Sequence, residues 1–211
     1  MREAIKAILN GLATIVVLPA LLSYAIKRLV LGPDRALEGS TQALAMIPGL
    51  VGVYLRRAFL ARTLAHCDWS ASVHFGTIFS QAGARIDANV YVGPNCHVGL
   101  VHIERDALLA SGVHVPSGSE THGTADVDRP IREQEGRRRL VRIGQGTWIG
   151  SAAVVMADVG QHSVIGAGSV VTKPIPDFSV AAGVPARVLQ SRQPGDLKRP
   201  GLHDDQGDPV S

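Results

Sequence analysis

The segment "IDANVYVGPNCHV", residues 86–98, places an aliphatic residue at every sixth position, at Ile86, Val92 and Val98. An aspartate or a glycine directly follows the first two of these residues. The same six-residue spacing recurs at residues 103, 109 and 115, and again at residues 143, 149 and 155. A further unit begins at residue 165, after a shortened stretch. A period of this length indicates a repeated structural unit that runs from residue 73 to about residue 190.

A six-residue unit with one inward aliphatic residue is the size of a short strand followed by a tight turn. Glycine and asparagine tolerate the positive φ that such turns require. Three units return the chain to its starting direction, so each set of three stacks as one triangular coil on the set before it. A β-sandwich would instead show alternation with period two and hairpin turns. We therefore predict an all-β fold, a left-handed parallel β-helix, which is a known exception to the right-handed rule for crossovers.

The N-terminal region differs from the repeats. Residues 7–26 and 39–55 carry no charged side chain, and each stretch contains a proline, Pro19 and Pro48, that would kink a helix. A helical hairpin in the membrane, a helix lying in the interface, a signal peptide, and helices that pack on the protein are all compatible with this pattern. We predict an N-terminal hydrophobic α-helical extension over residues 1–66 that associates with a membrane surface.

Composition limits the remaining possibilities. Formal net charge is +3 and the isoelectric point is near 9.1, which requires no nucleic acid but suits anionic lipids or phosphorylated ligands. The two cysteines, Cys67 and Cys96, form no disulfide framework and favour a reducing compartment. We expect a cytoplasmic protein on the cytoplasmic face of the inner membrane, with a β-helix domain over residues 67–190 and a disordered tail over residues 191–211.

Several motifs carry a family resemblance. "TWIGSAAVV", "VIGAGSVVTKPIP" and "VAAGVPARVL", together with a histidine-bearing segment ahead of them, resemble the hexapeptide-repeat O-acetyltransferases, such as galactoside and maltose acetyltransferases and their exopolysaccharide-locus relatives. The resemblance covers residues 73–190. It implies an acetyl-CoA-dependent acyltransferase that assembles as a homotrimer, with the donor bound between parallel β-helices.

A long interruption of the repeat contains the candidate base. In "SETHGTADVDRPIREQ", residues 119–134, His122 matches the position of the family's catalytic histidine. An alcohol is a poor nucleophile at neutral pH, and a histidine supplies the base that transfer to a hydroxyl needs. By resemblance, Ser151 is the candidate donor to the developing oxyanion. His114 is the next candidate for the base.

The resemblance also implies a set of residues for the donor. Trp148 would flank the pantetheine arm, Ser151 and Ala167 would approach it, and three further residues would lie toward the nucleotide: Thr172, Lys173 and Arg187. Positive side chains suit the phosphates of coenzyme A.

The acceptor is less defined. A run of arginines follows His122 at Arg129, Arg132, Arg137, Arg138, Arg139 and Arg142. Such a run is usually a solvated face, but beside a membrane-seeking N-terminus it suits a lipid-linked saccharide or a polysaccharide precursor. Serine is the alternative acceptor, and a non-catalytic scaffold is the alternative from another functional class.

A zinc-dependent β-helix enzyme, similar to the β-helical carbonic anhydrases, is a further alternative. His97 and His102 reproduce the paired ligand spacing of that family, but Ala61 stands where the resemblance requires a third histidine. We therefore expect no metal site.

Overall fold

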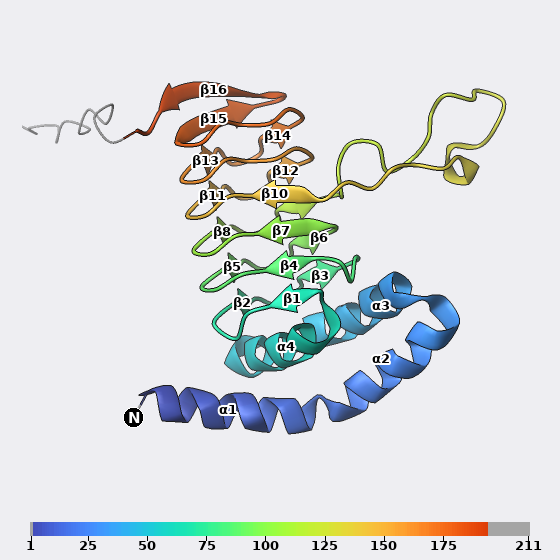
Figure 1. Ribbon diagram of the computed structural model, residues 1–211, viewed down its shortest axis with the longest axis vertical. Coiled ribbons are helices and arrows are strands. Elements are labelled where there is room, and N and C mark those ends of the chain that lie inside the picture. Colours follow the sequence, from blue (N-terminus) through green and yellow to red (C-terminus); the bar gives the residue numbers. More distant parts are fainter. Residues whose placement is uncertain (1, 194–211) are drawn as a thin grey trace, which may run out of the picture.

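The structure is a computed structural model that describes residues 2–193. Four helices at the N-terminus form a layer at one end of a stack of triangular coils, and a long loop projects from the side of the stack (Figure 1). The helices are α1 (Arg2–Val16), α2 (Leu18–Leu31), α3 (Pro33–Ala45) and α4 (Gly49–Thr63). The predicted tail lies almost entirely outside the described residues.

The strands form three faces of the triangular stack. Face 1 contains β1 (His66–Cys67), β4 (Arg85–Ile86), β7 (Val101–Ile103) and β10 (Val141–Ile143). Face 2 contains β2 (Ser72–Val73), β5 (Tyr91–Val92), β8 (Leu108–Leu109), β11 (Trp148–Ile149), β13 (Val164–Ile165), β15 (Ser179–Gly183) and β16 (Ala186–Ser191). Face 3 contains β3 (Ile78–Phe79), β6 (His97–Val98), β9 (His114–Val115), β12 (Val154–Val155) and β14 (Val170–Val171).

Neighbouring strands on each face are parallel, except that β16 runs antiparallel to β15 at the end of the stack. Isolated bridges at Val159 and Ile175 continue face 1 beyond β10. Successive strands along the chain pass from face 1 to face 2 to face 3, so one coil is three strands and three corners. The predicted left-handed parallel β-helix is confirmed.

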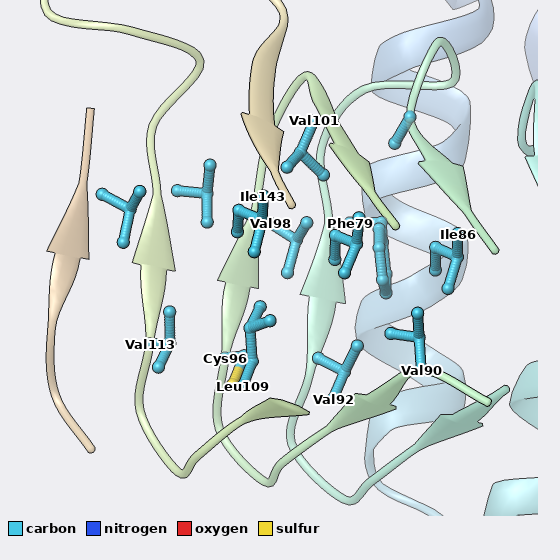
Figure 2. Close-up of a cluster of buried hydrophobic side chains, with 14 of the residues drawn as sticks. Phe79, Ile86, Val90, Val92, Cys96, Val98, Val101, Leu109, Val113 and Ile143 are labelled. Carbon is cyan, nitrogen blue, oxygen red and sulfur yellow. The ribbon is translucent and has the colours of Figure 1, made fainter. Parts of the chain in front are cut away.

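The core of the stack consists of the residues that set the six-residue period. Ile86, Val92 and Val98 are fully buried, as are their counterparts in later coils, and Figure 2 shows these side chains pointing into the interior between the strands. Cys96 points into the same interior. Burial raises the pKa of the Cys67 thiol to about 12, so this thiol is an apolar core group rather than a nucleophile.

Tight turns at the corners explain the glycine and asparagine content. Asn89 and Asn95 have φ of 60° and 58°, and Gly112 and Gly168 have φ of 69° and 67°. These values lie in the left-handed region, which glycine and asparagine adopt at little cost. Ala152 adopts the same conformation, with φ of 57°.

Helices α3 and α4 close the open end of the first coil. An uncapped coil would expose unpaired backbone groups, as any sheet edge does. The Thr41 hydroxyl donates to the carbonyl of Phe79 at 3.1 Å and accepts from its amide at 3.2 Å. Asp34 accepts the Ala82 amide at 2.9 Å. The uncharged stretch over residues 39–55 is thus divided at Pro48 between two helices that cap the β-helix.

Arg56 is the central residue of this cap. Its guanidinium is buried and donates to the carbonyls of Val73 at 2.9 Å, Leu44 at 3.0 Å and Ile47 at 2.8 Å. Burial lowers the pKa of Arg56 below its ordinary value. This arginine therefore ties the end of α3 and the first coil to α4.

Helices α1 and α2 form an outer layer with a largely apolar outer surface. On the inner side, Ala13 and Val17 pack against Leu55 and Ala58, and the Tyr24 ring meets the Phe59 ring edge-on at 5.8 Å. The exposed apolar residues of α1 and α2 include Ile8, Leu12, Ile15, Leu22, Ile26, Leu29 and Val30.

No single helix within residues 2–193 is long and apolar enough to cross a bilayer. The part of α1 from Lys6 onward and α2 meet the criteria of length and composition only as a pair, and the two are bent by 50°.

Candidate functional site

A loop over residues 116–140 leaves the stack at the corner between β9 and β10, which joins face 3 to face 1 (Figure 1). Its two arms lie against each other at the base. Arg139 donates its amide to the Ser117 carbonyl at 2.8 Å, and Arg137 donates its amide to the Glu120 carbonyl at 2.6 Å. Farther out, the Gln134 side chain donates to the Asp126 carbonyl at 2.7 Å. The loop is therefore held together by its own hydrogen bonds.

His122 is exposed in the first arm of this loop. Gly136 of the opposite arm packs on the backbone at Thr121, so closely that a Cβ at residue 136 would overlap the Thr121 carbonyl and the His122 amide. Gly123 makes a similar approach to the carbonyl of Glu135. The two glycines thus allow the arms to fix the backbone around the candidate base.

Ser151 and Ala167 lie at the corner that joins face 2 to face 3. Ser151 follows β11 and Ala167 follows β13, and both are exposed. They occupy equivalent turns of successive coils, because the Gly168 amide donates to the Ser151 carbonyl at 2.8 Å. A Cβ at Gly150 would lie 2.7 Å from the Ile165 carbonyl oxygen and would press on the backbone at Ala167. The two turns therefore stack closely and form one exposed edge at this corner.

Trp148 is the first residue of β11 on face 2, and 52% of its side chain is exposed. Its neighbours on the face are Leu108, also partly exposed, and Val164. A large, exposed aromatic ring beside the Ser151 turn suits contact with a narrow organic chain.

Thr172 and Lys173 follow β14 at the corner between face 3 and face 1, the same corner from which the loop leaves the stack. Thr172 lines a cavity of about 240 Å³ whose other walls come from the base of the loop and from the coil. The lining includes Glu120, Arg137, Arg139, Met156 and Pro174. Sequence reasoning did not single out Glu120, and it treated the arginines only as a run, because their meeting with Thr172 depends on how the loop folds back.

Arg187 lies in β16, opposite Ala182 of β15, and its side chain is exposed. It therefore sits at the C-terminal end of the stack. The predicted donor residues are thus distributed over two corners and the end of the β-helix. The chain brings together Ser151, Ala167 and Trp148, and separately brings Thr172 close to the loop that carries His122. His122 and Ser151 belong to different corners.

Part of the arginine run has a structural role. Arg139 forms an ion pair with Asp158 at 2.7 Å, and Arg142 donates to Glu104. For Glu104, burial alone would raise the pKa, but hydrogen bonds from Arg142 and from the Gln145 amide outweigh it, and the pKa is lowered. These pairs attach the returning arm of the loop to face 1.

The two histidines of the zinc alternative lie on different faces. His97 is on face 3, with its ring 6.1 Å from that of His114, whereas His102 is on face 1 and contacts Asp87 at 3.0 Å. Within residues 2–193, no three His, Cys, Asp or Glu side chains are grouped in a way that could hold a metal ion.

Comparison with known proteins identifies the family. Residues 140–173 match the model of the hexapeptide repeat of succinyl-transferase. A putative lipopolysaccharide biosynthesis O-acetyl transferase, WbbJ of Escherichia coli strain K12, is 31% identical over 164 residues, which are 67% of this chain and 83% of the relative. The chain belongs to the hexapeptide-repeat acetyltransferase family. This membership confirms the predicted family and the predicted enzyme class, an acyltransferase.

Galactoside acetyltransferases provide two further comparisons. Galactoside O-acetyltransferase of Escherichia coli strain K12 is 56% identical over 52 residues, 24% of this chain and 26% of the relative. A solved structure of galactoside acetyltransferase in complex with coenzyme A has a TM-score of 0.58 and 24% identity, covering 77% of this chain and 82% of that one. The matched segment is only about a quarter of the length of this galactoside O-acetyltransferase and of a probable acetyltransferase of Mycobacterium tuberculosis.

Proposed function

We propose that this acetyltransferase moves an acetyl group from acetyl-CoA to a hydroxyl of a saccharide, with His122 as the general base. One observation carries the proposal. A β-helix typical of the family presents an exposed histidine, in a loop held by its own hydrogen bonds, together with an exposed edge at Ser151 and Ala167. The names of the relatives support a saccharide acceptor, since one acts on galactosides and another is assigned to lipopolysaccharide biosynthesis.

The chemistry is a direct transfer. The imidazole of His122 takes the proton of the acceptor hydroxyl while the oxygen attacks the thioester carbonyl. Ser151 stabilises the negative charge that develops on the carbonyl oxygen. The carbon–sulfur bond then breaks, and the sulfur leaves as the thiol of coenzyme A with the proton that His122 had accepted. No covalent acyl-enzyme is needed, because both substrates are bound together.

The distribution of residues over two corners supports a homotrimer. Parallel packing of copies sets the Ser151 corner of one subunit beside the His122 loop of the next, because a cyclic interface brings different surfaces of the same chain together. Trp148, Ser151 and Ala167 then hold the acyl end of the donor, and the residues toward its phosphates are Thr172, Lys173 and Arg187. Positive side chains at that end complement the negative charges of the nucleotide.

The outer surface of α1 and α2 supports membrane association. Eleven large apolar side chains between residues 8 and 31 are exposed on this layer at the end of the stack, an arrangement typical of a helix that lies in the bilayer interface. We place the enzyme at the cytoplasmic face of the inner membrane, where a lipid-linked saccharide precursor would be its acceptor.

Thiol release from acetyl-CoA tests the proposal when different acceptors are supplied in parallel. Purified enzyme is incubated with extracted glycolipid, with polysaccharide, with free galactosides and with L-serine, and products are identified by mass spectrometry. We expect an increase of 42 Da, about the mass of one acetyl group less a proton, on a saccharide. Acetylation of serine alone would support the alternative acceptor, and no transfer to any acceptor would favour a scaffold.

A further inference from the structure

Two hollows lie along the contact between α1 and α4, at the end of the stack opposite the candidate active site. The first is a polar pocket of about 580 Å³ at the corner between faces 1 and 2. Its lining comes from both helices and from the first turns of the β-helix: Lys6, Ala7, Asn10, Tyr54, Arg57, Asp68, Trp69, Ser70, Ser72 and Asn89. None of these residues has a role in the proposed transfer.

Arg57 gives this polar pocket its charge. Only 8% of the residue is exposed, yet it forms no ion pair in the described part of the chain. One Nη donates to the Asn10 Oδ1 at 2.6 Å and the other to the Ala71 carbonyl at 3.3 Å. Its Nε has no hydrogen-bond partner among residues 2–193, and the guanidinium lies 4.4 Å from the centre of the Tyr54 ring.

The hydrogen-bond acceptors that the structure describes for this buried guanidinium are neutral. This arrangement is unusual, because burying a charge without a counter-ion costs free energy. Asp68 lines the same pocket but accepts the hydroxyl and the amide of Ser70 at 2.6 and 2.8 Å. Lys6 lines the pocket as well. The buried positive charge of Arg57 therefore favours an anionic ligand, such as a phosphate group.

The second hollow is an apolar groove of about 360 Å³ between the same two helices. Leu9, Leu12, Ala13 and Val16 of α1 face Leu50, Val51, Tyr54 and Leu55 of α4 across it. Tyr54 lines both hollows, so the groove continues directly from the polar pocket. Leu12 and Val51 remain 55% and 67% exposed, which leaves apolar area that a hydrocarbon chain would cover.

We propose that the α1–α4 groove binds one anionic phospholipid, with the phosphate in the polar pocket beside Arg57 and a hydrocarbon chain in the apolar groove. This site deepens the membrane association proposed above and rests on it. It is separate from acetyl transfer, because the pocket lies at the first coil while His122 lies on the loop after β9. The bound lipid would orient the β-helix with its helical end toward the bilayer.

Trp69 provides a direct test, because it lines the polar pocket and the only other tryptophan is Trp148. In full-length protein carrying Trp148→Phe, Trp69 fluorescence is titrated with dihexanoyl phosphatidylglycerol below its aggregation concentration. Inorganic phosphate is the head-only probe and a neutral monoacylglycerol is the chain-only probe. We expect the phospholipid to bind at least about tenfold more tightly than either probe.

Two variants with matched controls separate the two parts of the site. Asn10→Asp places a carboxylate beside Arg57. Because this carboxylate would form an ion pair with Arg57, phospholipid binding should weaken about tenfold. Gln42→Glu adds the same charge elsewhere and should leave phospholipid binding unchanged. Leu12→Ser should weaken the phospholipid and the monoacylglycerol but not phosphate, whereas Leu29→Ser, outside the groove, should leave all three unchanged.

Phospholipid binding that Asn10→Asp and Leu12→Ser leave unaltered would overturn the proposal, as would equal binding of phosphate alone. The measurement contains no acetyl-CoA and no acceptor. A negative result in the lipid titration therefore does not bear on acetyl transfer, and a negative result in the transfer assay does not bear on lipid binding.

Discussion

His122 and Ser151 lie at two different corners of the triangular β-helix, one between faces 3 and 1 and the other between faces 2 and 3. A single chain therefore separates the candidate base from the candidate oxyanion donor. The proposed transfer therefore requires a second copy of the chain, which brings the two residues together.

Mixed assemblies test that requirement. His122→Ala removes the base, and Ala167→Trp blocks the donor edge, so each homo-oligomer should be inactive. When the two variants are co-assembled at equal amounts, random assortment should restore about a quarter of the wild-type sites. Thiol release from acetyl-CoA measures the recovery. If mass spectrometry demonstrates mixed oligomers and activity does not recover, then His122 and Ala167 do not belong to a site shared by two subunits.

Gly136 should control the position of the candidate base without controlling stability. Gly136→Ala forces the second arm of the loop away from Thr121 and His122, and we expect kcat to fall about tenfold as the base is displaced. The melting temperature should change little, because the loop is braced mainly by its own contacts. Gly39→Ala is the control, since space is open there within α3 and the change should stabilise by about 0.5–1 kcal/mol. An unchanged kcat in Gly136→Ala would mean that this contact does not position His122.

Arg56 should be necessary for the helical cap. Arg56→Met leaves the carbonyls of Val73, Leu44 and Ile47 without their donor, and we expect a loss of about 3 kcal/mol in the free energy of unfolding. Arg85→Met, on the exposed surface of face 1, should change it by less than about 0.5 kcal/mol. Denaturant titration gives both values. Equal effects of the two substitutions would show that the first coil needs no such cap.

His74 should make stability depend on pH. Burial and the nearby Arg56 lower its pKa below the ordinary value of 6.5 in the folded state. The unfolded chain therefore binds the proton more readily, so the contribution of His74 is present above pH 6.5 and is lost as the pH falls below it. In His74→Gln, the decline in melting temperature between about pH 7 and 5 should be shallower. A slope in His74→Gln equal to that of the wild type would show that His74 makes no such contribution.

The repeat could be predicted from the sequence because its signal is local. Each six-residue unit buries one aliphatic residue and turns at one corner, so Ile86, Val92 and Val98 reveal the period without long-range information. The motif around Ser151 was equally accessible, since it lies within a repeat.

The cap and the loop could not be predicted in the same way. An uncharged stretch such as residues 39–55 signals burial but does not say whether lipid or protein covers it. Arg56 and Arg57 directly follow this stretch, as positive residues flank many membrane segments, yet both side chains are buried. Likewise, the contact of Gly136 with Thr121 joins residues whose meeting depends on the whole loop.

The rate of acetyl transfer by His122→Ala shows whether His122 is the general base. Transfer to the saccharide acceptor and binding of acetyl-CoA by calorimetry are measured on the same preparations of wild type and variant. We predict a turnover lower by about 10²–10⁴, the usual contribution of a positioned base, with unchanged donor affinity and melting temperature. Normal turnover in His122→Ala would show that His122 is not the base and would make His114 the next candidate.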